Sequence, residues 1–139
     1  MNVVTKELNL HTKCELNMVN ITDKVAGAVR ASGLRNGVVT VFIPGSTAGV
    51  TTIEYEPGLL KDFPEMLERI APKDMPYDHE KMWHDGNGHS HVRAALLGPS
   101  LTVPFNDGRL VLGTWQQVVF VELDIHSRSR NIILQIIGE

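Results

Sequence analysis

Cysteine is nearly absent from this chain of 139 residues, which has one, Cys14. A lone cysteine cannot form a disulfide within the chain, which excludes a disulfide-rich secreted scaffold and is typical of a reducing compartment. We expect Cys14 to be a small, partly buried side chain in a strand rather than a nucleophile.

Long hydrophobic runs are also missing. No apolar stretch approaches the roughly 18 residues that a membrane-spanning helix needs. The first residues show no charged start followed by an apolar stretch of about 7 to 15 residues, which is the pattern of a secretory signal. These observations predict a cytoplasmic protein with no membrane partner.

The chain has no excess of positive charge. Thirteen Lys and Arg stand against sixteen Asp and Glu, a formal net charge of −3, so nothing in the overall charge favours binding to nucleic acid or to an anionic membrane. Hydrophobic residues make up 42% and charged residues 21%, which is ordinary for a globular chain with a real core. The length predicts one domain, residues 1–139.

Strand-like segments outnumber helical ones. We expect strands within residues 3–19, 38–43, 50–53, 101–112 and 116–137, with an Asn106-Asp107-Gly108 hairpin turn and a central last strand, 132–137, covered on both faces. Helices are expected at 22–33, 57–70 and 92–97, the first capped by Thr22 and ended by Gly33, the second kinked or broken at Pro64. The pattern predicts an α+β fold, a mainly antiparallel β-sandwich with two to three short helices.

Four of the six histidines fall within thirteen residues, and this is the strongest functional signal. They are His79, His84, His89 and His91. Neutral imidazole is a good ligand for zinc and similar ions, and nearby carboxylates and glycines can complete and shape a site. The spacing matches no standard zinc motif, and a solvated polar loop is the alternative. If a helix began here, His89 and His91 would point apart, because two residues turn an α-helix by about 200°.

The turn before the predicted third helix is a candidate anion site. Gly86, Asn87, Gly88 and Ser90 can present free backbone N–H groups at a helix N-terminus, where a phosphate or carboxylate binds favourably. An ordinary capped surface helix is the alternative.

Further candidates lie elsewhere in the chain. Trp115 could stack on an aromatic ring, Gln116 could supply amide hydrogen bonds, and Glu54 or Asp85 could act as a base. From residue 116 onward, even positions carry acidic and then basic side chains, which favours a surface charge ladder. Its members are Glu122, Asp124, Arg128 and Arg130. Arg130, beside the buried last strand, is the hardest of them to place in solvent, and binding of a phosphate is its alternative role.

An ordered series of motifs resembles the YjbQ family. The series runs through Gly-Ser-Thr-Ala-Gly at 45–49, Thr-Thr-Ile-Glu at 51–54, Tyr-Asp-His at 77–79, the loop 83–91, Leu-Gly-Pro-Ser-Leu at 97–101, Gly-Thr-Trp-Gln-Gln at 113–117 and Ser-Arg at 129–130. The resemblance implies a compact homotrimer with polar pockets near subunit boundaries. It also implies a divalent metal, zinc in the first place and magnesium as an option with a diphosphate substrate. His79 and His91 match the family's common histidines, whereas Ser46 stands where some relatives have another.

The resemblance implies a secondary thiamine-phosphate synthase activity, in which a pyrimidine-methyl diphosphate is joined to a thiazole phosphate with loss of diphosphate. The metal, the helix N-terminus and Arg130 would then stabilise the departing diphosphate, and Trp115 would stack on a ring. Two alternatives remain open. One is a metal-dependent hydrolase of a small phosphate ester or amide, with Glu54 or Asp85 as the base. The other is a non-enzymatic trimeric module that binds a metal or a small anion.

Overall fold

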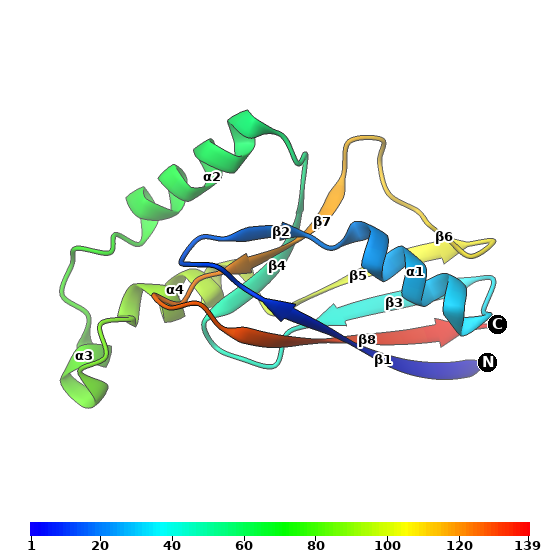
Figure 1. Ribbon diagram of the computed structural model, residues 1–139, viewed down its shortest axis with the longest axis horizontal. Coiled ribbons are helices and arrows are strands. Elements are labelled where there is room, and N and C mark those ends of the chain that lie inside the picture. The colour runs from blue at the N-terminus through cyan, green and yellow to red at the C-terminus, as the bar shows by residue number, and fades with distance from the viewer.

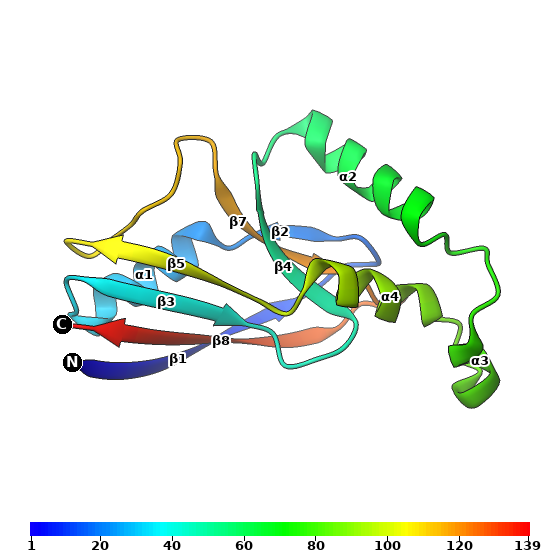
Figure 2. The same ribbon diagram turned by 180° about the vertical axis from the view of Figure 1, so that it is seen from behind.

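The computed structural model describes residues 1–139 and contains two antiparallel sheets (Figures 1 and 2). The larger sheet is formed by β1 (Asn2–His11), β3 (Gly37–Phe42), β5 (Ser100–Asn106), β6 (Arg109–Leu110) and β8 (Ser129–Gly138), in the order β1-β8-β3-β5-β6. The smaller sheet is formed by β2 (Met18–Asn20), β4 (Ala48–Ile53) and β7 (Gln117–Glu122), in the order β2-β7-β4. Every strand pair is antiparallel, which confirms the predicted α+β class.

Four helices accompany the sheets, one more than expected. They are α1 (Thr22–Ser32), α2 (Pro57–Ile70), α3 (Asp78–Trp83) and α4 (Gly88–Leu97). Helix α3 is the unexpected one, and α4 begins four residues before the predicted start at residue 92. None of the four is both long and apolar enough to cross a membrane.

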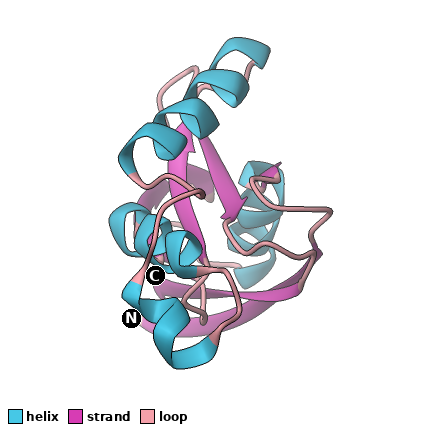
Figure 3. Ribbon diagram, turned by 90° about the vertical axis from the view of Figure 1, so that its left-hand side faces the viewer, coloured by secondary structure: helices cyan, strands magenta, loops and turns pink.

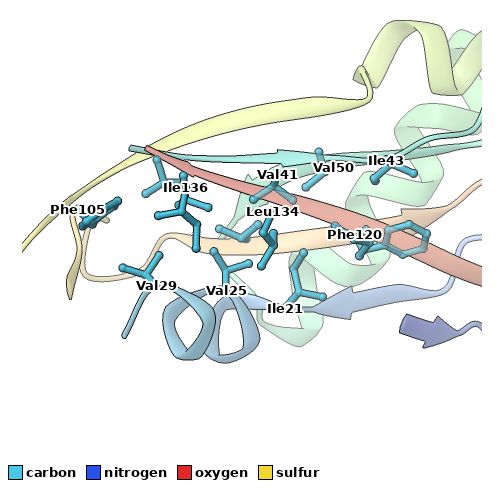
Figure 4. Close-up of a cluster of buried hydrophobic side chains, with 14 of the residues drawn as sticks. Ile21, Val25, Val29, Val41, Ile43, Val50, Phe105, Phe120, Leu134 and Ile136 are labelled. Carbon is cyan, nitrogen blue, oxygen red and sulfur yellow. The ribbon is translucent and has the colours of Figure 1, made fainter. Parts of the chain in front are cut away.

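The main core lies between the two sheets and α1. The smaller sheet and α1 lie side by side over one face of the larger sheet (Figures 1 and 4). Val25 and Val29 of α1, Leu134 and Ile136 of β8, and Phe120 of β7 all meet in this cluster. Burial of such apolar side chains, at about 25 cal/mol per Å² of surface removed from water, is the main stabilising contribution here.

A second apolar cluster covers the other face of the smaller sheet. Val119 and Val121 of β7 point away from the main core and pack with Leu67 of α2 and Ala94 of α4. Strand β7 is therefore buried on both faces. Helices α2, α3 and α4 gather at one end of the molecule, the end that faces the viewer in Figure 3.

Local sequence signals explain several chain reversals. Helix α1 ends at Gly33 with φ 75°, as predicted. The hairpin between β5 and β6 turns at Asp107 (φ 48°) and Gly108 (φ 72°), the left-handed conformations that such two-residue turns require. Thr22 lies in the first turn of α1 and does not cap it, because Ile21 occupies the capping position. Helix α2 continues without interruption through Pro64.

Two burial predictions need correction. Strand β8 is central, between β1 and β3, but only its core face is fully buried: Leu134 is completely covered, whereas Ile133 and Ile137 are half-buried. Cys14 is exposed in the segment between β1 and β2 rather than partly buried in a strand.

Candidate functional site

The reversal between α3 and α4 brings two histidines together. Helix α3 ends at His84, whose φ is 55°, and Gly86 follows with φ 71° before α4 begins at Gly88. These left-handed residues turn the chain back on itself, so that the His79 ring on α3 meets the His91 ring on α4 with centroids 4.3 Å apart. This contact between two imidazoles is the centre of the candidate site.

A carboxylate and an amide lie beside His79. Its Nε2 is 3.4 Å from Asp85 Oδ1. With its NH2 group turned toward them, the Asn87 side chain donates to His79 Nε2 over 3.1 Å and to Asp85 Oδ1 over 2.8 Å. Asn87 is buried, and in the opposite orientation of its amide the NH2 group lies 3.5 Å from Oδ1 of the buried Asp124. The two histidines therefore lie in a negatively charged corner, which attracts cations and disfavours anions.

His91 is held in its neutral form and faces a small cavity. Partial burial and the neighbouring His79 ring lower the pKa of His91 below its ordinary value of 6.5. At neutral pH its unprotonated nitrogen can accept a proton or coordinate a metal. A cavity of about 220 Å³ opens beside it, lined from the facing turn by Gly45 and Ser46. The glycine-containing turn and the histidine loop, far apart in the sequence, thus share one cavity.

His89 does not belong to this centre. It is almost completely buried, and its Nε2 hydrogen-bonds Glu15. The buried Arg93 donates from Nε to the Ala71 carbonyl over 2.9 Å and pairs with Glu68 of α2. Burial alone would raise the pKa of Glu15, but hydrogen bonds from Lys73 and His89 outweigh it and the pKa is lowered. This network connects α4 to α2 and to the segment between β1 and β2, and no spacing of residues in the sequence indicated it.

The helical rotation expected for His89 and His91 explains their separation, since α4 already begins at Gly88. His84 is exposed at the end of α3. No three His, Cys, Asp or Glu side chains lie close enough together to enclose a metal ion. Of the four histidines considered as ligands, only His79 and His91 therefore lie together within one chain.

The predicted anion site at the start of α4 is filled by a side chain of the protein itself. The Gly88 N–H donates to Glu80 Oε1 over 2.6 Å. Ser90 is fully buried, and its hydroxyl makes no hydrogen bond to the protein. The carboxylate of Glu80 thus occupies the place that a phosphate would take at this helix N-terminus.

Arg130 lies in a buried ion pair next to the site. Its Nε donates to Oε2 of Glu122 over 2.8 Å, and its Nη2 donates to Thr47 Oγ1 over 2.9 Å. Glu122 is fully buried at the end of β7. Most of the donors of Arg130 are thus satisfied within the chain.

The neighbouring carboxylate, Asp124, is also enclosed. It accepts from Thr47 Oγ1 over 3.1 Å and from Arg128 Nε over 2.9 Å. Burial would raise its pKa, but the Ile125 N–H, Thr47 and Arg128 together lower it below 3.8. The expected surface charge ladder was wrong. The strand ends at Glu122, and both carboxylates turn inward to a network behind Asn87.

Glu54, Trp115 and Gln116 lie at the far end of β4 from these histidines. Strand β4 starts next to Thr47 and ends at Ile53, and the five steps between its first and last residues, at about 3.3 Å each, separate the two ends by roughly 17 Å. Glu54 and Trp115 line a different cavity, and Gln116 donates to Thr52 Oγ1 over 3.0 Å. Within one chain the structure does not bring them to the histidine centre.

Comparison with known proteins places the chain in a family. Residues 6–139 match the family model described as UPF0047 protein YjbQ-like. The chain is 42% identical over 139 residues to a UPF0047 protein of Methanothermobacter thermautotrophicus, covering 100% of this chain and 95% of that one, and 31% identical over 135 residues to YugU of Bacillus subtilis, covering 96% and 98%. The chain belongs to the YjbQ (UPF0047) family.

Solved structures agree with this assignment. The fold superposes on a YbjQ-like protein of unknown function from Sulfolobus solfataricus with a TM-score of 0.93 and 34% identity, covering 99% of both chains. A YjbQ/UPF0047 protein from Clostridium acetobutylicum gives a TM-score of 0.87 and 36% identity over 95% of this chain and 99% of that chain. The YjbQ-like fold expected from the sequence motifs is confirmed.

Proposed function

We propose that this protein is a metal-assisted enzyme acting on small organic phosphates, with the secondary thiamine-phosphate synthase reaction as the first candidate. That reaction joins a pyrimidine-methyl diphosphate to a thiazole phosphate and releases diphosphate. The observation that carries the proposal is the contact between His79 and His91, with Asp85 beside them and a cavity at His91.

His79, His91 and Asp85 are the residues that would hold the cation. Two ligands bound about 2.0–2.2 Å from a tetrahedral zinc ion lie roughly 3.4 Å from each other, and His79 Nε2 and Asp85 Oδ1 are 3.4 Å apart. The three side chains do not lie close enough together to enclose an ion, so they would have to move together to bind it, and water or a substrate oxygen would complete the coordination. A bound divalent cation, zinc or magnesium, would neutralise charge on a departing diphosphate.

The protein groups that could have bound a phosphate at this site are already paired with carboxylates, which favours a bound cation as the positive charge that a phosphate would contact. Glu80 already occupies the N-terminus of α4, and Arg130 is committed to Glu122. We therefore assign Arg130 a positioning role: it fixes Glu122 and Thr47, and Thr47 in turn holds Asp124 behind Asn87.

A hydrolytic reaction is the second candidate, and the lowered pKa of His91 favours it. In this reaction His91 would act as a base in place of coordinating the cation, since a neutral imidazole facing a cavity can accept a proton from water, as hydrolysis of a phosphate ester requires. Asp85 can orient His79 in the same step. The third alternative, a module that binds a metal or anion without turnover, would use the same residues.

A homotrimer belongs to the proposal, as does the cytoplasmic location expected from the sequence. Helix α2 supports self-association, since only Leu67 on it is buried while Met66 and Ile70 remain 48% and 59% exposed. Such apolar surface is typical of a subunit interface.

The test is turnover of the pyrimidine diphosphate and thiazole phosphate pair, before and after chelation and readdition of zinc or magnesium. Chelator-sensitive release of diphosphate with formation of thiamine phosphate would support the synthase. Phosphate release from a single ester, with no coupling product, would support the hydrolase. Stoichiometric metal without either reaction would contradict an enzymatic role and leave the binding module.

A further inference from the structure

A basic cavity lies on a part of the molecule that the histidine centre does not touch. It has a volume of about 620 Å³ and opens among β1, β2 and the start of α1. Three basic side chains line it, His11, Lys13 and Lys24, and no Asp or Glu is among its lining residues. Neither Lys13 nor Lys24 takes part in an ion pair. Their positive charges are available to a ligand.

A second cavity adjoins the basic one. It has a volume of about 350 Å³ and shares the lining residues Asn20 and Tyr55 with the first. Trp115, 71% exposed, forms its aromatic wall, and Glu54 supplies a carboxylate. The two cavities therefore meet at a ridge made by Asn20 and Tyr55.

Hydrogen bonds fix this ridge in place. The Tyr55 hydroxyl donates to the Met18 carbonyl over 2.9 Å. Asn20 donates to Gln117 Oε1 over 3.1 Å and accepts from the Thr22 hydroxyl over 2.7 Å. Both side chains are held by β2, β7 and α1, so the division between the basic and the aromatic cavity is preformed, which reduces the ordering cost of binding.

We propose that the two cavities form one binding site for a small organic phosphate that carries an aromatic ring. The phosphate binds Lys13 and Lys24, whose ammonium groups act as point charges for it. The ring extends past Tyr55 and stacks on Trp115. Glu54 accepts a hydrogen bond from an amino or N–H group on the ring.

The charge distribution selects this class of ligand. A polyanion such as nucleic acid would bring phosphates against Glu54 and Glu56 of the second cavity as well as against the lysines, and the net charge of the chain is −3. A ligand with one anionic end and one ring satisfies both cavities. The combined size lies within the range of about 300–1,000 Å³ usual for small-molecule sites. The site shares no lining residue with the cavity at His91, and the inference does not depend on the proposed function.

Phenyl phosphate is the probe, with phenol and inorganic phosphate as partial probes. In a Trp83→Phe background, Trp115 is the only tryptophan and its fluorescence reports on the second cavity. We expect saturable quenching by phenyl phosphate at millimolar or lower concentration and weaker binding of either partial probe. Lys13→Ala and Lys24→Ala should each weaken binding by about tenfold, equivalent to roughly 1.4 kcal/mol. Trp115→Ala should weaken it to a similar degree, measured by calorimetry.

Two controls keep the test decisive. Lys61→Ala removes an exposed, unpaired lysine from α2 and should leave the affinity unchanged. His91→Ala should also leave it unchanged, which separates this site from the histidine centre. Absence of saturable binding, equal losses in Lys61→Ala and Lys13→Ala, or loss of binding in His91→Ala would each overturn the proposal. Lys13 and Lys24 are exposed, so their replacement leaves the fold intact, and an NMR spectrum of each variant checks this.

Discussion

Asp124 is a single carboxylate that links the buried ion pairs to the histidine centre. Its hydrogen bonds from Ile125, Thr47 and Arg128 stabilise the charged form and lower its pKa below the ordinary value of 3.8. Above pH 3.8 this stabilisation is fully present. As the pH falls through the lowered pKa, the unfolded state binds the proton more readily, and the stabilisation is lost.

Replacement of Asp124 by Asn should therefore reduce both stability and its acid dependence. We expect Asp124→Asn to lower the free energy of unfolding at pH 7 by about 1–3 kcal/mol, because Arg128 and Thr47 lose a charged acceptor. The variant should also lose less stability than wild type between pH 5 and pH 3, in urea titrations at a series of pH values. Parallel pH curves for the two proteins would contradict the role given to this carboxylate.

The sequence distinguished the histidines of the candidate site from the other histidines only in part. His79 and His91 were identified through family motifs, and their contact follows from the reversal between α3 and α4. His89 points away from His91 because α4 begins before His89. The good helix formers at 92–97 did not reveal this early start of the helix. The buried partners Glu15 and Arg93 could not be found, because their pairing joins segments 78 residues apart.

Arg93 connects helix α4 to helix α2. It is 1% exposed and bonds Ala71 and Glu68 at the end of α2. We expect Arg93→Met to lower the free energy of unfolding by about 3 kcal/mol, since the buried Ala71 carbonyl loses its charged donor. Arg69→Met, which removes an exposed and unpaired arginine from α2, should change it by less than about 0.5 kcal/mol. Equal effects in denaturant titrations would show that Arg93 does not hold the two helices together.

Two glycines at the junction of α3 and α4 should respond differently to replacement by alanine. A Cβ atom on Gly88 would lie 2.5 Å from Tyr77 Cβ and 2.8 Å from Glu80 Oε2, whereas one on Gly86 meets nothing within 4 Å. Gly88→Ala should therefore displace α3 and disrupt the His79–His91 contact, with a loss of about 1–3 kcal/mol. Gly86→Ala should cost only about 1 kcal/mol, from its positive φ. NMR shifts of the two imidazoles distinguish the cases, and unchanged shifts in Gly88→Ala would contradict this account.

Elements with strong local signals were predicted well. Gly33 and the Asn-Asp-Gly turn end or join elements at the expected places, and the apolar β-branched runs form strands. Helix α3 was missed because six residues with no apolar periodicity carry little signal. Pro64 was expected to kink or break α2, and the helix is not broken there, since it runs from Pro57 to Ile70. The long-range pairing of the strands had no signal in one sequence.

The exposed apolar face of α2 supports assembly of the protein into an oligomer. We expect size-exclusion chromatography with light scattering to give a mass near three times 15.4 kDa. Ile70→Glu, which places a charge on this face, should shift the mass toward that of one chain. Lys61→Glu on the same helix is the matched control and should leave the mass unchanged. A monomeric wild-type protein would contradict the assembly proposed for it.

We propose that His79 and His91, with Asp85, hold a divalent cation. The most direct measurement is the metal content of purified wild-type protein, His79→Ala and His91→Ala, by elemental analysis after dialysis against zinc. His11→Ala, which replaces an exposed histidine of β1, is the control. We expect about one metal per chain in wild type and in His11→Ala, and loss of the metal in His79→Ala and His91→Ala while circular dichroism shows an intact fold. Stoichiometric metal retained in His91→Ala, or none in wild type, would contradict the proposal.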